Sequence, residues 1–426
     1  MTPSLVDVSP PQVISWNLTA RCPLSCDHCY LSAGGRQSRD GELSTQQCLD
    51  TVDQIGQLNP ATVLILTGGE PLLRSDLERI AERAAGHGML VVVGSSGITL
   101  TPARAGRLAE AGVAGVGISL DSDQAEFHDN LRGMPGAWAK ATAGMRSVRD
   151  AGMALSVQMT ILRGNHERLE QVAEHACAAG ARVMTAYFLV CTGRAHDATD
   201  LSPVEYERVC ARLRDLENKY REQMMVAAKC APHYRRIVHE LEGPSAEVRS
   251  FGAGCPAGRD YLRIGPRGEV TPCPYLPLSV GRLDGEPLAA LWNDSPVFRA
   301  LRERHLSGRC GRCEYQESCG GCRARAYAVQ DDLNGEDPSC RYVPTSRRRL
   351  DVVHSGYGKV RASTMQWQEG AAARLQSVPS ILRSMVVRRT EAAAREAGDD
   401  CVTVEHLTRL RQTFMTRATQ EKHRRG

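Results

Sequence analysis

The sequence predicts an α/β fold: a partial (β/α)6 barrel of the TIM type, then a small cysteine-rich α+β domain and a carboxyl-terminal helical domain. Six short apolar runs recur between residues 13 and 188, and segments of helical character separate them. Seven cysteines then fall within residues 255–340. Residues 366–422 have the periodicity of two helices and contain a single cysteine.

The six apolar runs are VISWNL from 13, VLILT from 63, LVVVG from 90, VGISL from 116, LSVQMT from 155 and VMTAYF from 183. Helices are expected between them, for example at Thr45 to Leu58, Asp76 to Gly86 and Ala137 to Gly152. Continuously apolar strands that alternate with helices are typical of parallel βα units. Because six units are too few for the usual eight-fold barrel, we expect a laterally open one.

The domain boundaries follow from changes in these patterns. We expect the barrel at residues 13–200, a helical connector at 201–250, the cysteine-rich domain at 251–344, a linker at 345–365 and the helical domain at 366–422. In the last domain, one helix is predicted to end at Gly398, and Thr403 is predicted to cap the next. The first of these helices should contain Leu375, Val378, Ile381, Met385 and Val386.

Composition restricts the compartment and the partners. Sixteen cysteines in a chain without a recognisable signal peptide favour metal or cluster ligation over disulfides. No apolar run approaches the length of a membrane span. We therefore expect a cytoplasmic protein with no membrane or nucleic-acid partner. Residues 343–426 carry a net charge of +8, which indicates a solvated surface or, alternatively, contact with an anionic partner. The two predicted helices there contribute Arg383, Arg388, Arg389, Arg395, Arg409 and Arg411.

The segment RCPLSCDHCY places Cys22, Cys26 and Cys29 in the loop after the first predicted strand. Zinc fingers and ribbons use paired C-x2-C or C/H sets, which this spacing does not provide. Three thiolates on a compact loop can hold three irons of a 4Fe–4S cluster and leave the fourth iron open to a small molecule. Structural or zinc-bound cysteines are the alternative.

The segment LTGGEP follows the second predicted strand and supplies Gly68, Gly69 and Glu70. Paired glycines let the backbone approach a ligand closely, and Glu70 offers an acceptor for an amino group. One βα unit after the three cysteines, this turn is expected to belong to the same site.

These motifs resemble the radical S-adenosylmethionine (SAM) superfamily over residues 13–200. The resemblance implies that Cys22, Cys26 and Cys29 ligate a SAM-binding 4Fe–4S cluster, and that residues 68–70 contact the amino group of SAM. It also implies an enzyme that cleaves SAM to methionine and a 5′-deoxyadenosyl radical, with a flavodoxin or ferredoxin as the type of electron donor. Further cofactor-binding residues implied by the resemblance are Tyr30, Ser95, Ser119 and Arg132.

The second cysteine region predicts further metal sites, with two zinc sites as the alternative. Its order resembles the SPASM domain, an auxiliary-cluster module of radical SAM enzymes. The resemblance implies one or two auxiliary 4Fe–4S clusters. One would be held by Cys310, Cys313, Cys319 and Cys340, and the other by Cys255, Cys273 and Cys322, with Cys230 or an open iron completing the latter. The remaining cysteines, Cys48, Cys177, Cys191, Cys210 and Cys401, are expected to be buried apolar residues.

Three segments, KCAPHYRR, VTPCPYLP and CGGCRARAYA, resemble radical SAM enzymes of alternative haem synthesis and of d-type haem synthesis. The carboxyl-terminal segment that begins WQEGAAARLQ resembles a helical domain of protochlorophyllide reductase subunits. These resemblances imply oxidative decarboxylation or removal of tetrapyrrole side chains. The alternatives are a SPASM-type maturase of ribosomally made peptides and a non-enzymatic iron–sulfur carrier.

A tetrapyrrole substrate carries carboxylates, so arginines near the site are candidate partners. A histidine is a candidate ligand of a haem iron, although a lone histidine is more often simply hydrogen-bonded. The candidates are Arg194, Arg235, Arg236, Arg323, Arg325, His196 and His233.

Overall fold

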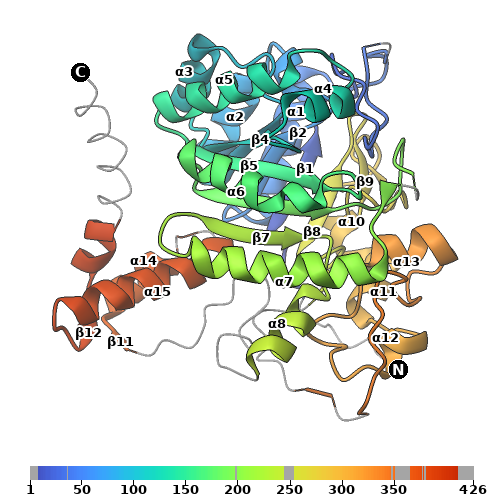
Figure 1. The fold of residues 1–426 in the computed structure, drawn as a ribbon. Helices are drawn as coiled ribbons and strands as arrows, with labels where there is room; N and C mark the ends of the chain where they lie inside the picture. The colour runs from blue at the N-terminus through green and yellow to red at the C-terminus, as the bar shows by residue number, and fades with distance from the viewer. Residues whose placement is uncertain are drawn as a thin grey trace.

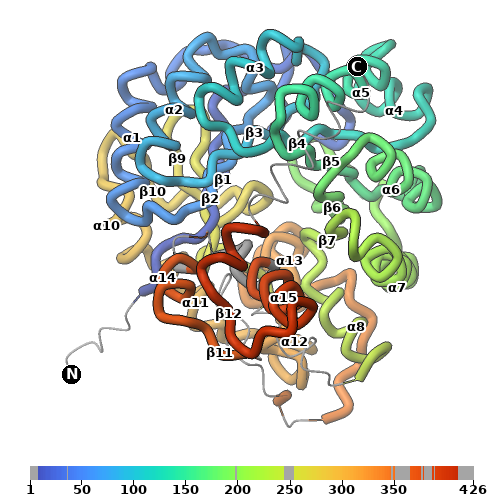
Figure 2. The backbone as a smooth tube through the Cα atoms, turned by 90° about the vertical axis from the view of Figure 1, so that its left-hand side faces the viewer, coloured from blue at the N-terminus to red at the C-terminus, as the bar shows by residue number. Residues whose placement is uncertain are grey.

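The computed structural model describes residues 8–35, 37–196, 199–243, 254–346, 349–350, 365–376, 378 and 380–410. One ten-stranded sheet runs through the main body in the order β10-β9-β8-β1-β2-β3-β4-β5-β6-β7. Figure 2 shows its strands curving inside an arc of helices, and Figure 1 shows the carboxyl-terminal helices at one side of this body.

The first six strands form the laterally open barrel that the sequence predicts. They are β1 (Val13–Asn17), β2 (Val63–Thr67), β3 (Leu90–Ser95), β4 (Gly115–Ser119), β5 (Ala154–Ile161) and β6 (Val183–Phe188), and each pairs in parallel with the next. The intervening helices are α1 (Thr45–Leu58), α2 (Leu77–Gly86), α3 (Pro102–Glu110), α4 (Ala125–Arg132), α5 (Ala137–Asp150) and α6 (Leu169–Ala178). All five residues of β1 are buried, as expected of a strand inside a parallel sheet, and they include the polar Ser15 and Asn17.

Helix starts follow local sequence. Ser44 and Gln47 form a reciprocal capping box at the start of α1, and Ser202 and Glu205 do the same for α7 (Pro203–Lys219). Proline at the first position of α7 has no N–H to satisfy, which also favours a helix start there.

The connector after the barrel corrects the expectation of a purely helical segment. Helix α7 ends at Lys219, and β7 (Met225–Lys229) follows, paired in parallel with β6, before α8 (Tyr234–Glu242). Met224 and Val226 are buried in this strand segment. Pairing with the free edge of β6 therefore outweighs the helical character that continues from α7.

The cysteine-rich region extends the opposite edge of the sheet. Strand β8 (Tyr261–Ile264) pairs in parallel with β1, and β9 (Glu269–Thr271) and β10 (Gly281–Arg282) continue it in antiparallel fashion. The helices of this region are α10 (Leu288–Asp294), α11 (Pro296–Glu303), α12 (Gly308–Arg312) and α13 (Arg323–Gln330). Because β8 hydrogen-bonds to β1, the two cysteine regions are joined by the same sheet.

The carboxyl-terminal part has its own small core of Ala371, Ala394, Val402 and Leu407. Strands β11 (Gln366–Trp367) and β12 (Cys401–Val402) pair in parallel beside α14 (Glu369–Gln376) and α15 (Ser380–Glu396). The single helix expected through Leu375 and Val386 is wrong. The sequence has Pro379 at the junction of the two helices, where a helix cannot continue undisturbed.

The expected end near Gly398 is confirmed, since this glycine has a φ of +78° after α15. The N–H of Thr403 donates to Nδ1 of His406, at the start of the next helical turn. Across the described ranges, none of the helices combines the length and the apolar character needed to cross a membrane.

Candidate active site

The loops at the carboxyl ends of β1 to β4 carry the residues that the sequence singles out. Cys22, Cys26 and Cys29 follow β1, Gly68 to Glu70 follow β2, and Ser95 and Ser119 end β3 and β4. Parallel neighbouring strands end at the same edge of a sheet, so the fold brings these loops together.

The three amino-terminal cysteines share one small cluster of packed residues with Leu24 and Ala33. The N–H of Leu24 points to Cys22 Sγ at 3.5 Å, and the N–H of Ala33 points to Cys29 Sγ at 3.4 Å. Burial raises the pKa of Cys22 to about 12, and the nearby Glu70, Cys26 and Cys29 add to the rise. Burial also raises the pKa of Cys26, and a bound metal would favour the ionised form of both thiols.

The two glycines after β2 allow a close approach between two segments of the chain. A Cβ on Gly69 would lie 2.3 Å from Arg21 O, and one on Gly68 would lie 2.6 Å from Thr19 O. Gly69 N–H donates to Thr19 O at 2.7 Å, and Glu70 N–H donates to Arg21 O at 2.8 Å. The two glycines were expected to let the backbone approach a ligand. In the structure they let it approach the segment that leads into Cys22.

Glu70 is fully buried, and both carboxylate oxygens already accept hydrogen bonds. Oε1 accepts from Ser95 Oγ at 2.8 Å, and Oε2 accepts from Ser96 N–H at 3.0 Å. Burial raises the pKa of Glu70, although these donors oppose the rise. Its side chain ties the ends of β2 and β3 together, a structural role that the sequence does not reveal.

Arg132, predicted to hold part of SAM, is bound to Asp121. Its Nε and Nη2 lie 2.7 and 2.6 Å from Asp121 Oδ2, and its Nη1 lies 3.8 Å from Cys26 Sγ. Burial alone would raise the pKa of Asp121, but the charge of Arg132, with His28 and His128 nearby, lowers it. The ion pair places a fixed positive charge beside the cysteine loop.

Tyr30 links the two cysteine regions. Its hydroxyl accepts from Asn17 Nδ2 at 2.9 Å, and Arg263 of β8 donates to the same asparagine. Its ring meets the ring of Tyr275 edge-on, with centroids 5.1 Å apart. Tyr275 lies two residues beyond Cys273, so this contact connects the loop after β1 with the second cysteine region.

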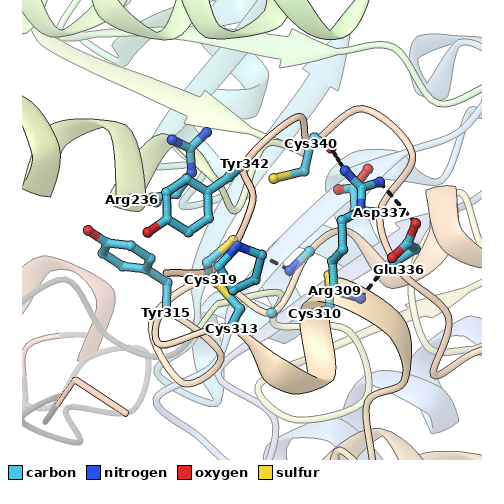
Figure 3. Close-up of a pocket in the computed structure, with 13 residues that line it drawn as sticks. Arg236, Arg309, Cys310, Cys313, Tyr315, Cys319, Glu336, Asp337, Cys340 and Tyr342 are labelled. Carbon is cyan, nitrogen blue, oxygen red and sulfur yellow. Dashed lines mark hydrogen bonds and ion pairs between the residues drawn. The ribbon is translucent and has the colours of Figure 1, made fainter. Parts of the chain in front are cut away.

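Four cysteines of the second region line one pocket (Figure 3). They are Cys310, Cys313, Cys319 and Cys340. A Cβ on Gly321 would lie 3.2 Å from Cys310 Sγ and 2.8 Å from Arg323 Nη2, so glycine is needed for this close packing.

The structure gathers the other cysteines into a second group. Cys230 and Cys273 pack against the cluster that contains the buried Cys322, and a hydrogen bond joins the side chains of Cys322 and Cys255. This hydrogen bond lowers the pKa of Cys255 to about 7, against the effect of burial. Cys230 has a φ of +60°, an uncommon conformation for a residue with a side chain.

The donor set fits iron–sulfur clusters. Buried nitrogens without a hydrogen-bond partner among the described residues include His28 Nδ1 and Arg323 Nη2, next to the first loop and the pocket respectively. Such nitrogens can donate to the sulfurs of a cluster. In the described part of the chain, no group of three His, Cys, Asp or Glu side chains lies close enough together to hold a single metal ion.

Comparisons with known proteins decide the family. Residues 16–176 match the family model for the radical SAM superfamily, and residues 255–323 match the iron-sulfur cluster-binding (SPASM) domain. The AdoMet-dependent heme synthase of Methanosarcina barkeri is 37% identical over 343 residues, which cover 78% of this chain and 97% of that protein. The chain belongs to the radical SAM superfamily.

Other similar proteins lie within the same superfamily. The pre-heme d1 synthase of Dinoroseobacter shibae is 32% identical, over 79% of this chain and 88% of that protein. The mycofactocin maturase MftC of Mycobacterium tuberculosis is 33% identical, over 78% of this chain and 83% of that protein. The structure of Streptococcus suis SuiB bound to S-adenosylmethionine superposes with a TM-score of 0.66 at 15% identity, covering 78% of each chain, which shows a shared fold.

The carboxyl-terminal residues 367–411 match a third family model, the proto-chlorophyllide reductase 57 kD subunit. The protein is thus a radical SAM enzyme that uses SAM and 4Fe–4S clusters, and it carries an additional helical domain. The families that the sequence indicated are confirmed.

The arginines expected to face a substrate carboxylate are mostly engaged by the chain itself. Arg236 pairs with Glu207 and Glu240 at 2.6 Å, and Arg325 pairs with Asp337 at 3.2 Å. Arg323 donates to three backbone carbonyls, and Arg194 donates to two others in the first cysteine loop. Arg235 also has an interaction with the rest of the chain.

The candidate haem ligand His233 is fully buried, with neither ring nitrogen hydrogen-bonded among the described residues, whereas His196 is exposed. Among the cysteines expected to be buried, Cys48 and Cys210 are buried, but Cys177, Cys191 and Cys401 are partly exposed.

Two residues of the site were missed by sequence reasoning. His28 lies between two cysteines and is close to Asp121 and Arg132, and burial lowers its pKa to about 4. Its position inside C-x2-C was the available signal. Asp121 itself directly follows the GISL run, where a carboxylate after a buried strand is a recognisable signal.

Proposed function

We propose that this radical SAM enzyme oxidatively modifies a tetrapyrrole, by decarboxylating or removing side chains during haem-type cofactor biosynthesis. The observation that carries the proposal is the 37% identity to an AdoMet-dependent heme synthase over nearly all of that protein. The similarity to a pre-heme d1 synthase supports it independently, because that name also refers to a haem-type product.

Residue roles follow from the site. We propose that Cys22, Cys26 and Cys29 hold the cluster that binds SAM. This cluster would supply the electron for SAM cleavage. Arg132 keeps a positive charge beside Cys26 through its ion pair with Asp121, in the position to attract an anionic group of SAM. Residues 68–70 hold the loop in place through Thr19 and Arg21 and can offer their remaining backbone groups to SAM. Tyr30, Ser95 and Ser119 complete the proposed cofactor-binding set.

The second region is proposed to hold two auxiliary clusters. Cys310, Cys313, Cys319 and Cys340 surround one, since they line a single pocket. Cys230, Cys255, Cys273 and Cys322 hold the other, since these four gather in the second group. Auxiliary clusters suit an oxidative reaction because the substrate must give up an electron. An electron donor of the flavodoxin or ferredoxin type and a cytoplasmic location complete the proposal.

The test is an anaerobic assay of the reconstituted protein with SAM, dithionite and candidate porphyrins, read by mass spectrometry. We expect methionine and 5′-deoxyadenosine, together with a porphyrin product lighter by the lost side-chain atoms. The variant with Cys22, Cys26 and Cys29 all replaced by Ala should form neither. Reductive SAM cleavage by that variant would disprove the assignment of the three cysteines.

The second candidate is a peptide maturase, favoured by the 33% identity to MftC. It predicts that porphyrins stay unchanged while a peptide substrate stimulates SAM cleavage. The third candidate, an iron–sulfur carrier, predicts no SAM cleavage by the wild type with any reductant.

A further inference from the structure

Arg194 joins two loops that are far apart in the sequence. It lies beyond β6, at the far end of the six-stranded barrel sheet from β1. Its Nε donates to Cys26 O at 2.9 Å, and its Nη1 donates to Ala33 O at 2.8 Å. Its backbone N–H donates to Cys29 O at 3.1 Å. One residue therefore binds the cysteine loop at three separate points.

Gly193 makes this approach possible. Its φ is +65°, and a Cβ there would lie 2.4 Å from Cys29 O and 2.5 Å from Tyr30 O. Any other residue would push the two loops apart or strain the backbone. The loop after β6 is thus fitted to the backbone of Cys29 and Tyr30, and the contact joins the loops that follow the first and the sixth strands.

Arg194 has one further donor, Nη2, which is buried without a hydrogen-bond partner among the described residues. His28 Nδ1, in the cysteine loop, is also buried without a hydrogen-bond partner among the described residues. A buried guanidinium nitrogen without a partner is costly unless a bound group accepts from it.

We infer that Arg194 is a positioning residue for SAM-dependent chemistry. It fixes the backbone of the cysteine loop at Cys26, Cys29 and Ala33, and its Nη2 donates to an acceptor atom of the group held by the three cysteines. The inference rests on the proposed function, because it assumes that Cys22, Cys26 and Cys29 hold the SAM-binding cluster. It replaces the expectation that Arg194 binds a substrate carboxylate.

The test compares Arg194→Gln and Arg194→Lys with the wild type. Arg214→Gln is the control, because Arg214 is a buried arginine that pairs with Glu217 and Glu242, away from the cysteine loop. Hydrogen exchange of residues 22–33 in the cluster-bound protein reports on the loop itself. The change in the electron paramagnetic resonance spectrum of the reduced protein on adding SAM reports on the SAM-binding cluster alone.

We expect Arg194→Gln to exchange residues 22–33 faster and to weaken SAM binding about 10-fold or more, since a charged hydrogen bond is lost. The signals of the auxiliary clusters should persist. In both readouts, Arg194→Lys should fall between the wild type and Arg194→Gln, because lysine keeps the charge but can reach fewer acceptors. Arg214→Gln should leave both readouts at the wild-type values.

Two results would overturn the inference while leaving the proposed function intact. One is a wild-type SAM response and exchange rate in Arg194→Gln. The other is an equal loss of all cluster signals in Arg194→Gln and Arg214→Gln, which would make Arg194 a general stability residue. A wild type without any SAM-responsive signal would instead overturn the proposed function, and this inference with it.

Discussion

Arg325 and Asp337 form a buried ion pair that lies between the two groups of auxiliary cysteines, with Nη1 3.2 Å from Oδ2. Arg325 Nη2 donates to Cys230 O at 3.0 Å, and Asp337 Oδ2 accepts from Cys322 N–H at 2.7 Å. Asp337 also lines the pocket of the other four cysteines. Burial alone would raise the pKa of Asp337, but the charge of Arg325, with His233 nearby, lowers it. The pair therefore holds both groups in one arrangement.

Replacing Asp337 by Asn should destabilise the protein by about 3–5 kcal/mol, because it leaves the Arg325 charge buried and unpaired. Iron content should fall at both auxiliary sites, while the SAM response of the amino-terminal cluster remains. Anaerobic urea unfolding and iron analysis measure the two effects. Asp284→Asn is the control, since Asp284 pairs with Arg282 on the surface and should cost at most about 1 kcal/mol. Equal effects of the two variants would contradict the role given to the pair.

Cys230 is predicted to complete the second auxiliary site. Cys230→Ala should therefore lose roughly one cluster's worth of iron and sulfide. Cys210→Ala is the control, because Cys210 lies on α7 in the hydrophobic core, so this variant should lose only packing contacts. Iron and acid-labile sulfide per chain measure the difference. Full iron content in Cys230→Ala would favour an open iron at that site.

Gly69→Ala should displace the loop of Cys22, because its Cβ would lie 2.3 Å from Arg21 O and 2.7 Å from Arg21 C. We expect the variant to contain less of the SAM-responsive cluster, while the iron of the auxiliary clusters stays unchanged. Electron paramagnetic resonance measures both. Gly106→Ala is the matched control, since nothing lies within 4 Å of a Cβ at this position inside α3. It should stabilise the protein by roughly 0.5–1 kcal/mol and leave the clusters alone.

The sequence predicted those parts of the fold that leave a local signal. The six barrel strands were found because each is a short run rich in apolar and β-branched residues between helical segments. The division of the second cysteine region into two sets was implied by the resemblance to the SPASM domain, and the structure gathers the same cysteines in two places. Strand β7 was missed because five residues at a sheet edge look much like the end of the preceding helix.

The roles of the arginines were not predictable, because they depend on contacts between distant segments. Arg194 reaches Cys26 across 168 residues, and Arg325 reaches Cys230 across 95. No local pattern distinguishes such a residue from a surface arginine that would bind a substrate carboxylate. Only the fold shows that the chain itself supplies the acceptors.

The ion pair behind the loop after β2 predicts a pH dependence of stability. Asp76 accepts from Thr45 Oγ1 at 2.7 Å and from Arg74 Nη2 at 2.6 Å. Burial alone would raise its pKa, but these donors outweigh burial and lower the pKa to about 2. Since the unfolded value is ~3.9, the stabilisation is fully present above about pH 4 and is lost as the pH falls toward 2.

Asp76→Asn should therefore lower the free energy of unfolding by about 1 kcal/mol at neutral pH, after allowance for partial exposure to solvent. The difference from the wild type should shrink below about pH 4. Urea unfolding over this pH range measures it, and Asp50→Asn is the control, because Asp50 is exposed and accepts from the exposed Gln46. A difference that stays constant down to about pH 3 would rule out this linkage.

The carboxyl-terminal domain has the structural features of an independent unit. Its core residues form a cluster of their own, and its strands β11 and β12 pair only with each other within the described residues. Of the arginines predicted on its helices, Arg389, Arg395 and Arg409 belong to the described part. Arg395 pairs with Glu391 at 3.4 Å. The side chains of Arg383 and Arg388, and all of Arg411, lie outside the described part.

Deleting residues from about Ser363 onward should leave reductive SAM cleavage nearly intact, because the cysteines and loops of the SAM site all lie in the rest of the chain. If the net positive charge of this part attracts an anionic substrate, the truncated enzyme should have a higher KM that depends less on salt. Steady-state kinetics at several salt concentrations measure both, with SAM cleavage in the absence of substrate as the control. An unchanged KM and salt response would assign the domain a purely stabilising role, and a loss of cluster iron would mean that it packs on the core.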